Sequence, residues 1–351
     1  MTFNPDSTAS RESGLFGLPF SADQSLIHLI PVPWEVTTSY GAGASRGPAA
    51  ILRASHQVDL FDLETGESYQ RGYFLQPESN DVKTWNRDGK EKAQRILKAI
   101  ERADDLDPAT QRLLAEVNTL SDHLNAWVLA QSQEILAKGK IPAVVGGDHS
   151  SPFGLMQALS QAHAGKFGIL HIDAHADLRQ HYQGYRYSHA SIMHNVMQEL
   201  SPQRLVQVGI RDFSRGEYDY IQANSRVTTF FDQVLKRRQQ RGETWQNIAG
   251  EIIAALPENV YISFDIDGLT PDLCPNTGTP VPGGLSFSEA TSLIAAVAES
   301  GRRIIGFDIN EVAEPEGSED DWDGNVGARL LYKLCGWTVM SQQRKEARLQ
   351  E

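Results

Sequence analysis

The stretch from Gly146 to Asp177 reads GGDHSSPFGLMQALSQAHAGKFGILHIDAHAD and contains two polar motifs. The first motif is GGDHS at 146–150, and the second is DAHAD at 173–177. A third motif, SFDIDGLTP, follows a further apolar run at 263–271. Each motif lies at or just after the carboxyl end of a run that reads as a strand. Because ligands of parallel sheets bind beyond these ends, the three motifs are predicted to form one site.

Apolar runs alternate with helix-like segments along most of the chain. Strands are predicted at residues 26–32, 72–75, 141–145, 168–172, 204–208, 227–231, 260–264 and 303–309. Helices are predicted at residues 46–58, 91–103, 109–138, 152–163, 189–199, 215–223, 245–255, 286–299 and 325–338. This alternation predicts an α/β protein of three layers, α/β/α, with a mostly parallel central sheet.

No repeat, low-complexity tract or linker divides the chain. We therefore expect an N-terminal arm over residues 1–24, a single domain over residues 25–340 and a C-terminal tail over residues 341–351. Within the domain, residues 87–140 are charged and periodic, and we expect them to form a helical insertion or extension.

The bulk composition restricts the partners of the protein. Its net charge of −13 comes from 32 basic and 45 acidic residues, which disfavours nucleic acid and anionic membrane surfaces. The two cysteines, Cys274 and Cys335, exclude a disulfide framework. The sequence shows no secretory signal and no apolar run of the roughly 18–20 residues that a membrane helix needs. These features predict a cytoplasmic protein.

The second and third motifs place acidic and imidazole side chains at alternate positions. Asp173, His175 and Asp177 are spaced i, i+2, i+4, and Asp265 and Asp267 repeat the same spacing. In extended backbone alternate side chains point to the same side, so each group is expected to converge. Any one of these residues could be a loop residue or a helix cap, but that explanation does not suit the whole set.

Two metal ions would remove the repulsion within such a cluster. Four adjacent aspartates would raise one another's pKa, whereas two divalent cations balance their charge. His149, in the loop after the strand at 141–145, adds a second imidazole. Carboxylate and imidazole ligands without thiolate suit Mn²⁺, and also Ni²⁺, Co²⁺ or Fe²⁺, rather than structural zinc. Two such metals can share a water and lower its pKa, so the predicted chemistry is hydrolysis.

The motifs resemble those of the ureohydrolase family, which comprises arginase, agmatinase and related guanidino-hydrolases of the arginase–deacetylase fold. GGDHS, DAHADLR and SFDIDGLTP match its three metal motifs in order and spacing. TGTPVPGGLSFSEA at 277–290 and GFDINEVAEP at 306–315 match two downstream signatures. The resemblance implies that Asp173 and Asp265 bridge two metals. The full set of implied ligands is His149, Asp173, His175, Asp177, Asp265 and Asp267.

The resemblance also implies three catalytic residues. Asp177 would accept a hydrogen bond from the nucleophile. Glu311 falls at the position of a guanidinium-binding glutamate, and a carboxylate can pair with a planar guanidinium in a fork. His189 falls where the family has a histidine that shuttles protons, and a pKa near neutrality would let it protonate the leaving amine. His181 and His194 are rivals for this role.

Two loops indicate the substrate. PWEVTTSYGAGASRGP at 33–48 lacks nucleotide-binding motifs and resembles a divergent agmatinase-like branch, some of whose members act on very small guanidines or use nickel. QHYQGYRY at 180–187 lacks the Asn/Ser pattern with which arginases hold arginine. Residues that could line a small pocket above the metals are Trp34, Thr37, Thr38 and Tyr40.

These observations predict a two-metal hydrolase of a small guanidino compound, agmatine-like or guanidine itself, that releases urea with an amine or ammonia. One alternative is hydrolysis of a formimino or other amidine substrate at the same site. Another is a subunit of a hetero-oligomeric guanidine-derivative hydrolase. The resemblance further implies a homo-oligomer, either a trimer or a hexamer.

Overall fold

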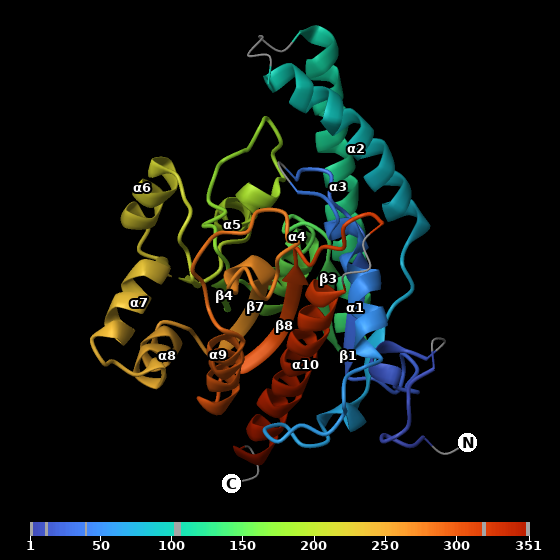
Figure 1. Cartoon of the computed structure of the whole chain (residues 1–351), viewed down its shortest axis with the longest axis vertical. Helices are drawn as coiled ribbons and strands as arrows, with labels where there is room; N and C mark the ends of the chain where they lie inside the picture. Colours follow the sequence, from blue (N-terminus) through green and yellow to red (C-terminus); the bar gives the residue numbers. More distant parts are fainter. Residues whose placement is uncertain (1–2, 11–12, 39–40, 102–106, 318–320, 349–351) are drawn as a thin grey trace.

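One parallel sheet forms the centre of the molecule (Figure 1). The computed structural model describes residues 3–10, 13–38, 41–101, 107–317 and 321–348, with side chains up to residue 343. Within these residues the eight strands follow the order β2-β1-β3-β8-β7-β4-β5-β6, and all neighbouring pairs are parallel. The strands are β1 Ile27–Val32, β2 Tyr73–Leu75, β3 Ile141–Gly146, β4 Gly168–Ile172, β5 Arg204–Val208, β6 Val227–Phe230, β7 Asn259–Asp265 and β8 Arg303–Asn310.

Helices cover both faces of this sheet, which confirms the predicted three-layer α/β/α fold (Figure 1). The helices are α1 Gly47–Ser55, α2 Asn80–Glu101, α3 Pro108–Ala137, α4 Phe153–His163, α5 Ile192–Asn195, α6 Arg215–Ala223, α7 Asp232–Gln240, α8 Trp245–Ala254, α9 Phe287–Glu299 and α10 Trp322–Arg348. One face carries α1 and α7–α10, and the other carries α2–α6. A hydrophobic core therefore lies between the sheet and the helices on each of its two faces.

Alternation along each strand supplies both cores. Leu29 and Ile262 pack into the core under α1 and α7–α10, whereas their neighbours Ile30 and Tyr261 pack into the core under α2–α6. Successive side chains of a strand point to opposite faces, so a strand covered on both sides must be apolar throughout. This is why the strands read as continuous apolar runs, and all eight lie within one residue of their predicted bounds.

The helices differ from the prediction most clearly at α7, at the start of α2 and at the end of α10, which continues ten residues past the predicted 338. Helix α7 was not predicted, because its sequence DQVLKRRQQ is strongly polar and buries only Leu235 and the first residue, Asp232. Helix α2 begins at Asn80, about three turns before the predicted start at 91, and is amphipathic with Val82 among its buried residues. Both helices are stabilised by tertiary packing of their apolar residues, with Leu235 of α7 in one core and Val82 of α2 in the other.

The two ends of the chain are more closely joined to the domain than the expected arm and tail. Leu15 and Leu18 are buried, and the ring of Phe16 lies edge-on to Tyr332 with centroids 4.9 Å apart. At the other end, α10 continues to Arg348, past the expected start of a tail at residue 341.

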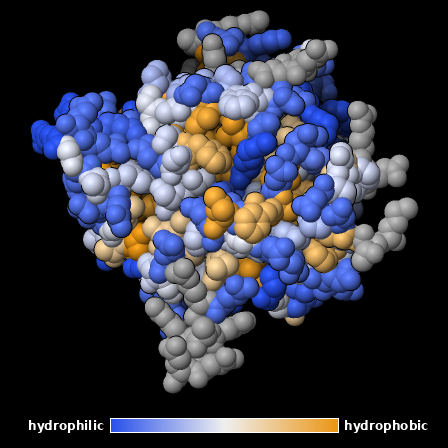
Figure 2. Space-filling model, turned by 60° about the horizontal axis from the view of Figure 1, so that its bottom comes forward, coloured by the Kyte–Doolittle hydropathy of each residue, from blue (hydrophilic) through white to orange (hydrophobic). Residues whose placement is uncertain are grey.

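Hydrophilic residues cover most of the face shown in Figure 2, and apolar residues gather in small areas near its middle. Among the helices of the described residues, none has both the length and the apolar character that crossing a membrane requires.

Strand order explains how distant motifs meet. β3, β8, β7 and β4 are consecutive in the sheet. The three polar motifs lie at the carboxyl ends of β3, β4 and β7, and Glu311 follows the carboxyl end of β8. In a parallel sheet these ends share one edge, so the residues that follow them lie at one site although their positions in the sequence extend from 146 to 311.

Candidate metal centre

The side chains predicted as ligands are brought together at this edge, almost wholly buried except for His175. Two groups there have atoms close enough to share a metal ion: His149, His171, Asp173 and Asp177 in one, and Asp173, His175 and Asp267 in the other. Asp173 belongs to both groups.

The two oxygens of Asp173 face different imidazoles. Oδ2 lies 3.0 Å from Nδ1 of His149, and Oδ1 lies 3.5 Å from Nδ1 of His175. On the His149 side, Oδ2 of Asp265 is 3.1 Å and Oδ2 of Asp177 is 3.4 Å from the same Nδ1. The carboxylate of Asp173 therefore lies between two sets of donor atoms, which is the geometry of a bridging ligand.

The surroundings of His149 fit a metal ion. Its Nε2 lies 2.9 Å from the hydroxyl of Ser263, which donates to Asp308 at 3.1 Å. The proton of the neutral ring therefore belongs on Nε2, and Nδ1 carries a lone pair. Nδ1 is buried and has no hydrogen-bond partner, although three carboxylates surround it. A proton or a metal cation must therefore lie between Nδ1 and these oxygens, and the Ser263–Asp308 contact fixes the ring as such pairs fix metal-binding histidines.

The cluster holds more negative charge than the protein itself balances. Among the described residues, no lysine or arginine pairs with Asp173, Asp177, Asp265 or Asp267. Burial, together with the charge of Asp173, raises the pKa of Asp177 well above its ordinary value. Burial and the charges of Asp267 and Asp173 do the same to the pKa of Asp265. Divalent cations would remove both effects.

His171 supports the cluster from the strand side. Its Nδ1 lies 3.0 Å from the amide nitrogen of Gln207, a donor, so the ring proton is on Nε2. Nε2 in turn donates to Oδ2 of Asp173 at 2.8 Å. With both nitrogens engaged, His171 orients a candidate ligand and has no free lone pair for a metal, in agreement with the structural role that its place within a strand suggests.

Asp177 and Glu311 have strained backbones. Their φ angles are +53° and +60°, in the left-handed region that residues other than glycine rarely adopt. Glu311 is almost fully buried, and its Oε1 accepts the backbone N–H of His149 at 2.9 Å. Burial and the nearby charges of Asp265 and Asp148 raise its pKa well above the ordinary value. Such strain at two polar, buried positions is typical of functional sites.

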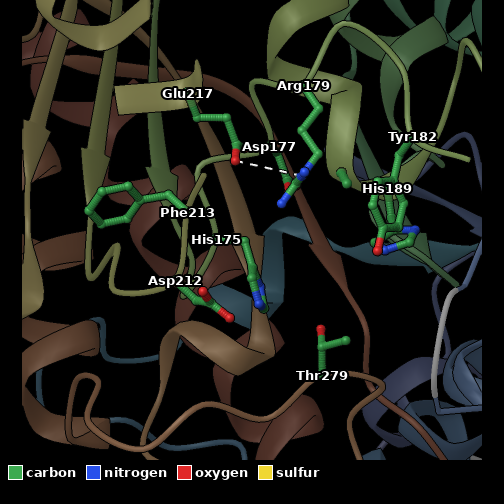
Figure 3. Close-up of a pocket in the computed structure, with 10 residues that line it drawn as sticks. His175, Asp177, Arg179, Tyr182, His189, Asp212, Phe213, Glu217 and Thr279 are labelled. Atoms are coloured by element: carbon green, nitrogen blue, oxygen red, sulfur yellow. Dashed lines mark ion pairs between the residues drawn. The ribbon is translucent and has the colours of Figure 1, made fainter. Parts of the chain in front are cut away.

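A cavity of about 170 Å³ opens beside the cluster (Figure 3). Three of the predicted residues, His175, Asp177 and His189, line it. Burial, with a smaller contribution from His175, lowers the pKa of His189 to about 4, so its ring is neutral at pH 7. This pKa differs from the near-neutral value that the sequence led us to expect, because the ring is held in a crowded loop next to other imidazoles.

Comparison with known proteins identifies the family. The arginase family matches residues 25–336 of the chain. An N(1)-aminopropylagmatine ureohydrolase of Thermus thermophilus is 33% identical over 314 residues, which is 90% of each chain. A guanidinobutyrase of Pseudomonas aeruginosa is 34% identical over 318 residues, covering 87% of this chain and 84% of its own. The crystal structure of an agmatine ureohydrolase of Thermoplasma volcanium shares the fold, with a TM-score of 0.70, 21% identity and 96% coverage of both chains.

The chain belongs to the arginase family. The expected ureohydrolase resemblance, in its agmatinase-like branch, is thereby confirmed, and so is the class of enzyme, a hydrolase of C–N bonds in linear amidines. The buried His/Asp cluster agrees with the metal dependence that the family implies.

In this member of the arginase family, the described part of the loop after β1 does not line the cavity as predicted. Trp34 is fully buried in the core under α2–α6. Thr37 is buried as well, and Thr38 donates to the carbonyl of Glu35 at 3.2 Å. Tyr40 lies outside the described residues. The rival histidines also lie elsewhere: His181 is exposed, and the His194 ring packs on Tyr220.

Sequence reasoning missed most of the cavity wall of this arginase family member. The lining residues not predicted are Arg179, Tyr182, Ala190, Asp212, Phe213, Glu217 and Thr279. Asp212 follows the carboxyl end of β5, as the metal motifs follow their strands, and this rule could have identified it. The remaining residues come from loops, from the 3-10 turn at His189–Ser191 and from the first turn of α6, and the sequence does not reveal how these segments approach the site.

Proposed function

We propose that the protein hydrolyses a small guanidino compound at a centre of two divalent metal ions, releasing urea with an amine or ammonia. The observation that carries this proposal is the buried Nδ1 of His149, which has no hydrogen-bond partner and lies among three carboxylates, next to the carboxyl group of Glu311. A cation-binding cluster is thus joined directly to a carboxyl group that could receive a guanidinium, because bound cations and the guanidinium itself would favour its ionised form.

The proposed ligands of the two metals are those that the motifs predict. His149 and Asp177 would hold one metal, His175 and Asp267 the other, and Asp173 and Asp265 would bridge them. When bound, two such cations supply a water nucleophile that is deprotonated near neutral pH. Mn²⁺ is the proposed metal and Ni²⁺ its alternative, since both accept carboxylate and imidazole ligands.

Glu311 is the proposed anchor of the guanidinium. Its Oε1 is engaged by the His149 N–H, whereas no described residue donates to Oε2. Gly278 lies beside Oε2: a Cβ added there would be 3.5 Å from this oxygen, so glycine leaves space next to the carboxylate. Charge-assisted pairing would orient the planar guanidinium toward the metals.

His189 and Asp177 are the proposed proton carriers. Because the pKa of His189 is depressed, the ring enters the reaction neutral and first accepts a proton. It can then donate that proton to the departing amine, which must leave in a protonated form. Asp177 reaches the same cavity and is proposed to orient the nucleophile by accepting its hydrogen bond.

The mouth of the cavity favours a substrate with a cationic tail. Asp212 lines it, is exposed and forms no ion pair with a described residue. The positive charge of Arg179 is balanced by Glu217, which lies 3.6 Å away (Figure 3). The guanidinium also lies over the ring of Tyr182. An ammonium tail such as that of agmatine would be attracted to Asp212, and a carboxylate tail such as that of 4-guanidinobutyrate would be repelled.

A substrate panel tests the function and the tail together. Agmatine, 4-guanidinobutyrate, arginine and free guanidine are incubated with Mn²⁺- and Ni²⁺-loaded protein, and urea is measured. Agmatine is expected to have the highest kcat/KM. Asp212→Asn should reduce the preference for agmatine over 4-guanidinobutyrate by about tenfold and leave free guanidine unaffected. Asp219→Asn, on the exposed side of α6, is the control.

The outcomes separate the alternatives. Absence of urea from all four compounds would overturn the proposal, and formamide from a formimino substrate would favour an amidine hydrolase instead. Urea from guanidine alone would retain the metal centre and reject the role of Asp212.

A further inference from the structure

The α2–α3 hairpin has no part in the chemistry proposed above, yet it contacts the site. It projects at the top of Figure 1, on the side toward which the arrow of β8 points. One face of α2, made of Asn86, Gly89 and Lys90 at i, i+3 and i+4, lies against the loop that follows β1. We call its described residues, 34–38 and 41–46, the β1–α1 loop.

Glu35 is the centre of this contact. Its side chain is fully buried, and its Oε2 accepts the backbone N–H groups of Gly43 at 2.7 Å and Ser45 at 3.0 Å. Its Oε1 pairs with Nζ of Lys90 on α2, and its own N–H donates to Asn86 at 2.8 Å. A single carboxylate therefore joins both ends of the β1–α1 loop to the hairpin.

Close packing accompanies the ion pair. A Cβ on Gly89 would lie 2.7 Å from Cγ2 of Val36, so the helix approaches the loop as near as a glycine permits. Burial would raise the pKa of Glu35, but the hydrogen bonds from Lys90, Ser45 and Gly43 hold it below its ordinary value. The carboxylate is therefore ionised in place, and Lys90 is its one cationic partner among the described residues.

The β1–α1 loop reaches the metal centre from its other side. The hydroxyl of Thr37 donates to Asp148, the neighbour of His149, at 3.2 Å and accepts the N–H of His189 at 3.2 Å. Gly41 donates to the carbonyl of Gly278 at 3.2 Å, and Gly278 is the residue beside Oε2 of Glu311. Displacement of this loop would therefore move the surroundings of both His189 and Glu311.

We propose that Lys90 and Glu35 are a positioning pair through which the α2–α3 hairpin holds the β1–α1 loop against the substrate side of the metal centre. Neither residue touches the reacting atoms. Their effect passes through Thr37 to His189 and through Gly41 to Gly278. The placement of the loop is inferred from these contacts alone. Its consequence for substrate binding rests on the proposed function.

Amide hydrogen exchange of the full-length protein tests the placement without any assay of activity. Lys90→Met leaves a buried carboxylate unpaired, so exchange at Gly43 and Ser45 is expected to accelerate by about tenfold or more. Lys90→Arg should restore protection. The double variant Glu35→Gln/Lys90→Met should also restore it, because a glutamine oxygen can accept both N–H groups without a buried charge.

Lys92→Met is the matched control. Lys92 lies on the same helix and pairs with Glu116 of α3 at 3.6 Å, within the hairpin. It should leave Gly43 and Ser45 protected. If Lys90→Met and Lys92→Met give equal exchange at these two amides, the proposal is overturned. It is also overturned if Lys90→Met accelerates exchange equally along α2, since Lys90 would then only stabilise the helix.

Steady-state kinetics on the best guanidino substrate tests the consequence. Lys90→Met is expected to lower kcat/KM by about fivefold or more, because displacement of the loop moves the surroundings of both Glu311 and His189. Bound metal should equal that of the parent protein. If Lys90→Met loses bound metal together with kcat, the positioning role is rejected. If the parent protein produces no urea, the proposed function is rejected, whereas the conclusion from hydrogen exchange is unaffected.

Discussion

Oε1 of Glu311 accepts the backbone N–H of His149 at 2.9 Å, although 162 positions separate the two residues in the sequence. They follow β8 and β3, which are neighbours in the sheet. The candidate guanidinium anchor is thus attached to the main chain of a candidate metal ligand. One hydrogen bond between two strand ends would therefore couple substrate orientation to metal position.

Glu311→Gln should separate the binding of the guanidinium from the binding of metal. The glutamine oxygen can still accept the His149 N–H, so metal content is expected to be unchanged, while loss of the charge should lower kcat/KM by about two to three orders of magnitude. Metal analysis and urea assays check this. Glu314→Gln is the control, since that carboxylate pairs with Arg53 at the surface. Full activity of Glu311→Gln would disprove the anchor.

Asp177→Asn should impair metal binding and hydrolysis together. Asparagine tolerates the left-handed φ of +53° at this position, so the fold should be retained. The neutral side chain removes one of the carboxylates around Nδ1 of His149, and we expect at least about tenfold weaker metal binding. Metal titration beside a thermal melt distinguishes the effects, and a variant with full metal and full activity would contradict the assignment.

Metal affinity should fall as the pH falls. In the protein without metal, burial and neighbouring carboxylates raise the pKa of Asp177 and Asp265. Burial would lower the pKa of His149, but Asp173 and Asp265 raise it well above its ordinary value. All three groups therefore retain protons above their usual pH range, and binding must release them. Titration calorimetry at about pH 6 and about pH 8, in buffers of different ionisation enthalpy, should show proton release and weaker binding at the lower pH. Equal affinity at both would count against the cluster as the ligand set.

Gly147→Ala should destabilise the protein. An added Cβ would lie 1.7 Å from the carbonyl oxygen of Trp34, and backbone cannot yield as a flexible side chain can. We expect a loss of about 1–3 kcal/mol or more in the free energy of unfolding. In Gly250→Ala, within α8, the Cβ meets nothing within 4 Å, and stability should rise by about 0.5–1 kcal/mol. Chemical denaturation of both variants measures the contrast.

Where sequence reasoning failed, a local signal was missing. The polar sequence of α7 buries little more than Leu235, so it carries no periodic stripe. Trp34 looked available for a pocket because it follows a strand, but the loop turns it into the core. The pKa of His189 depends on burial and neighbouring rings, which no motif records.

The sequence by itself determined the eight strands, the parallel sheet and the family. Strands buried on both faces must be continuous apolar runs, and alternate Asp and His at their ends follow from the two-residue period of extended chain. Only the tertiary structure decided the cavity wall, the neutral state of His189 and the contact of Lys90 with Glu35. These depend on loop paths and on helix-to-loop packing between segments far apart in the chain. Such contacts are set by desolvation and close approach, and therefore leave no periodic mark in the sequence.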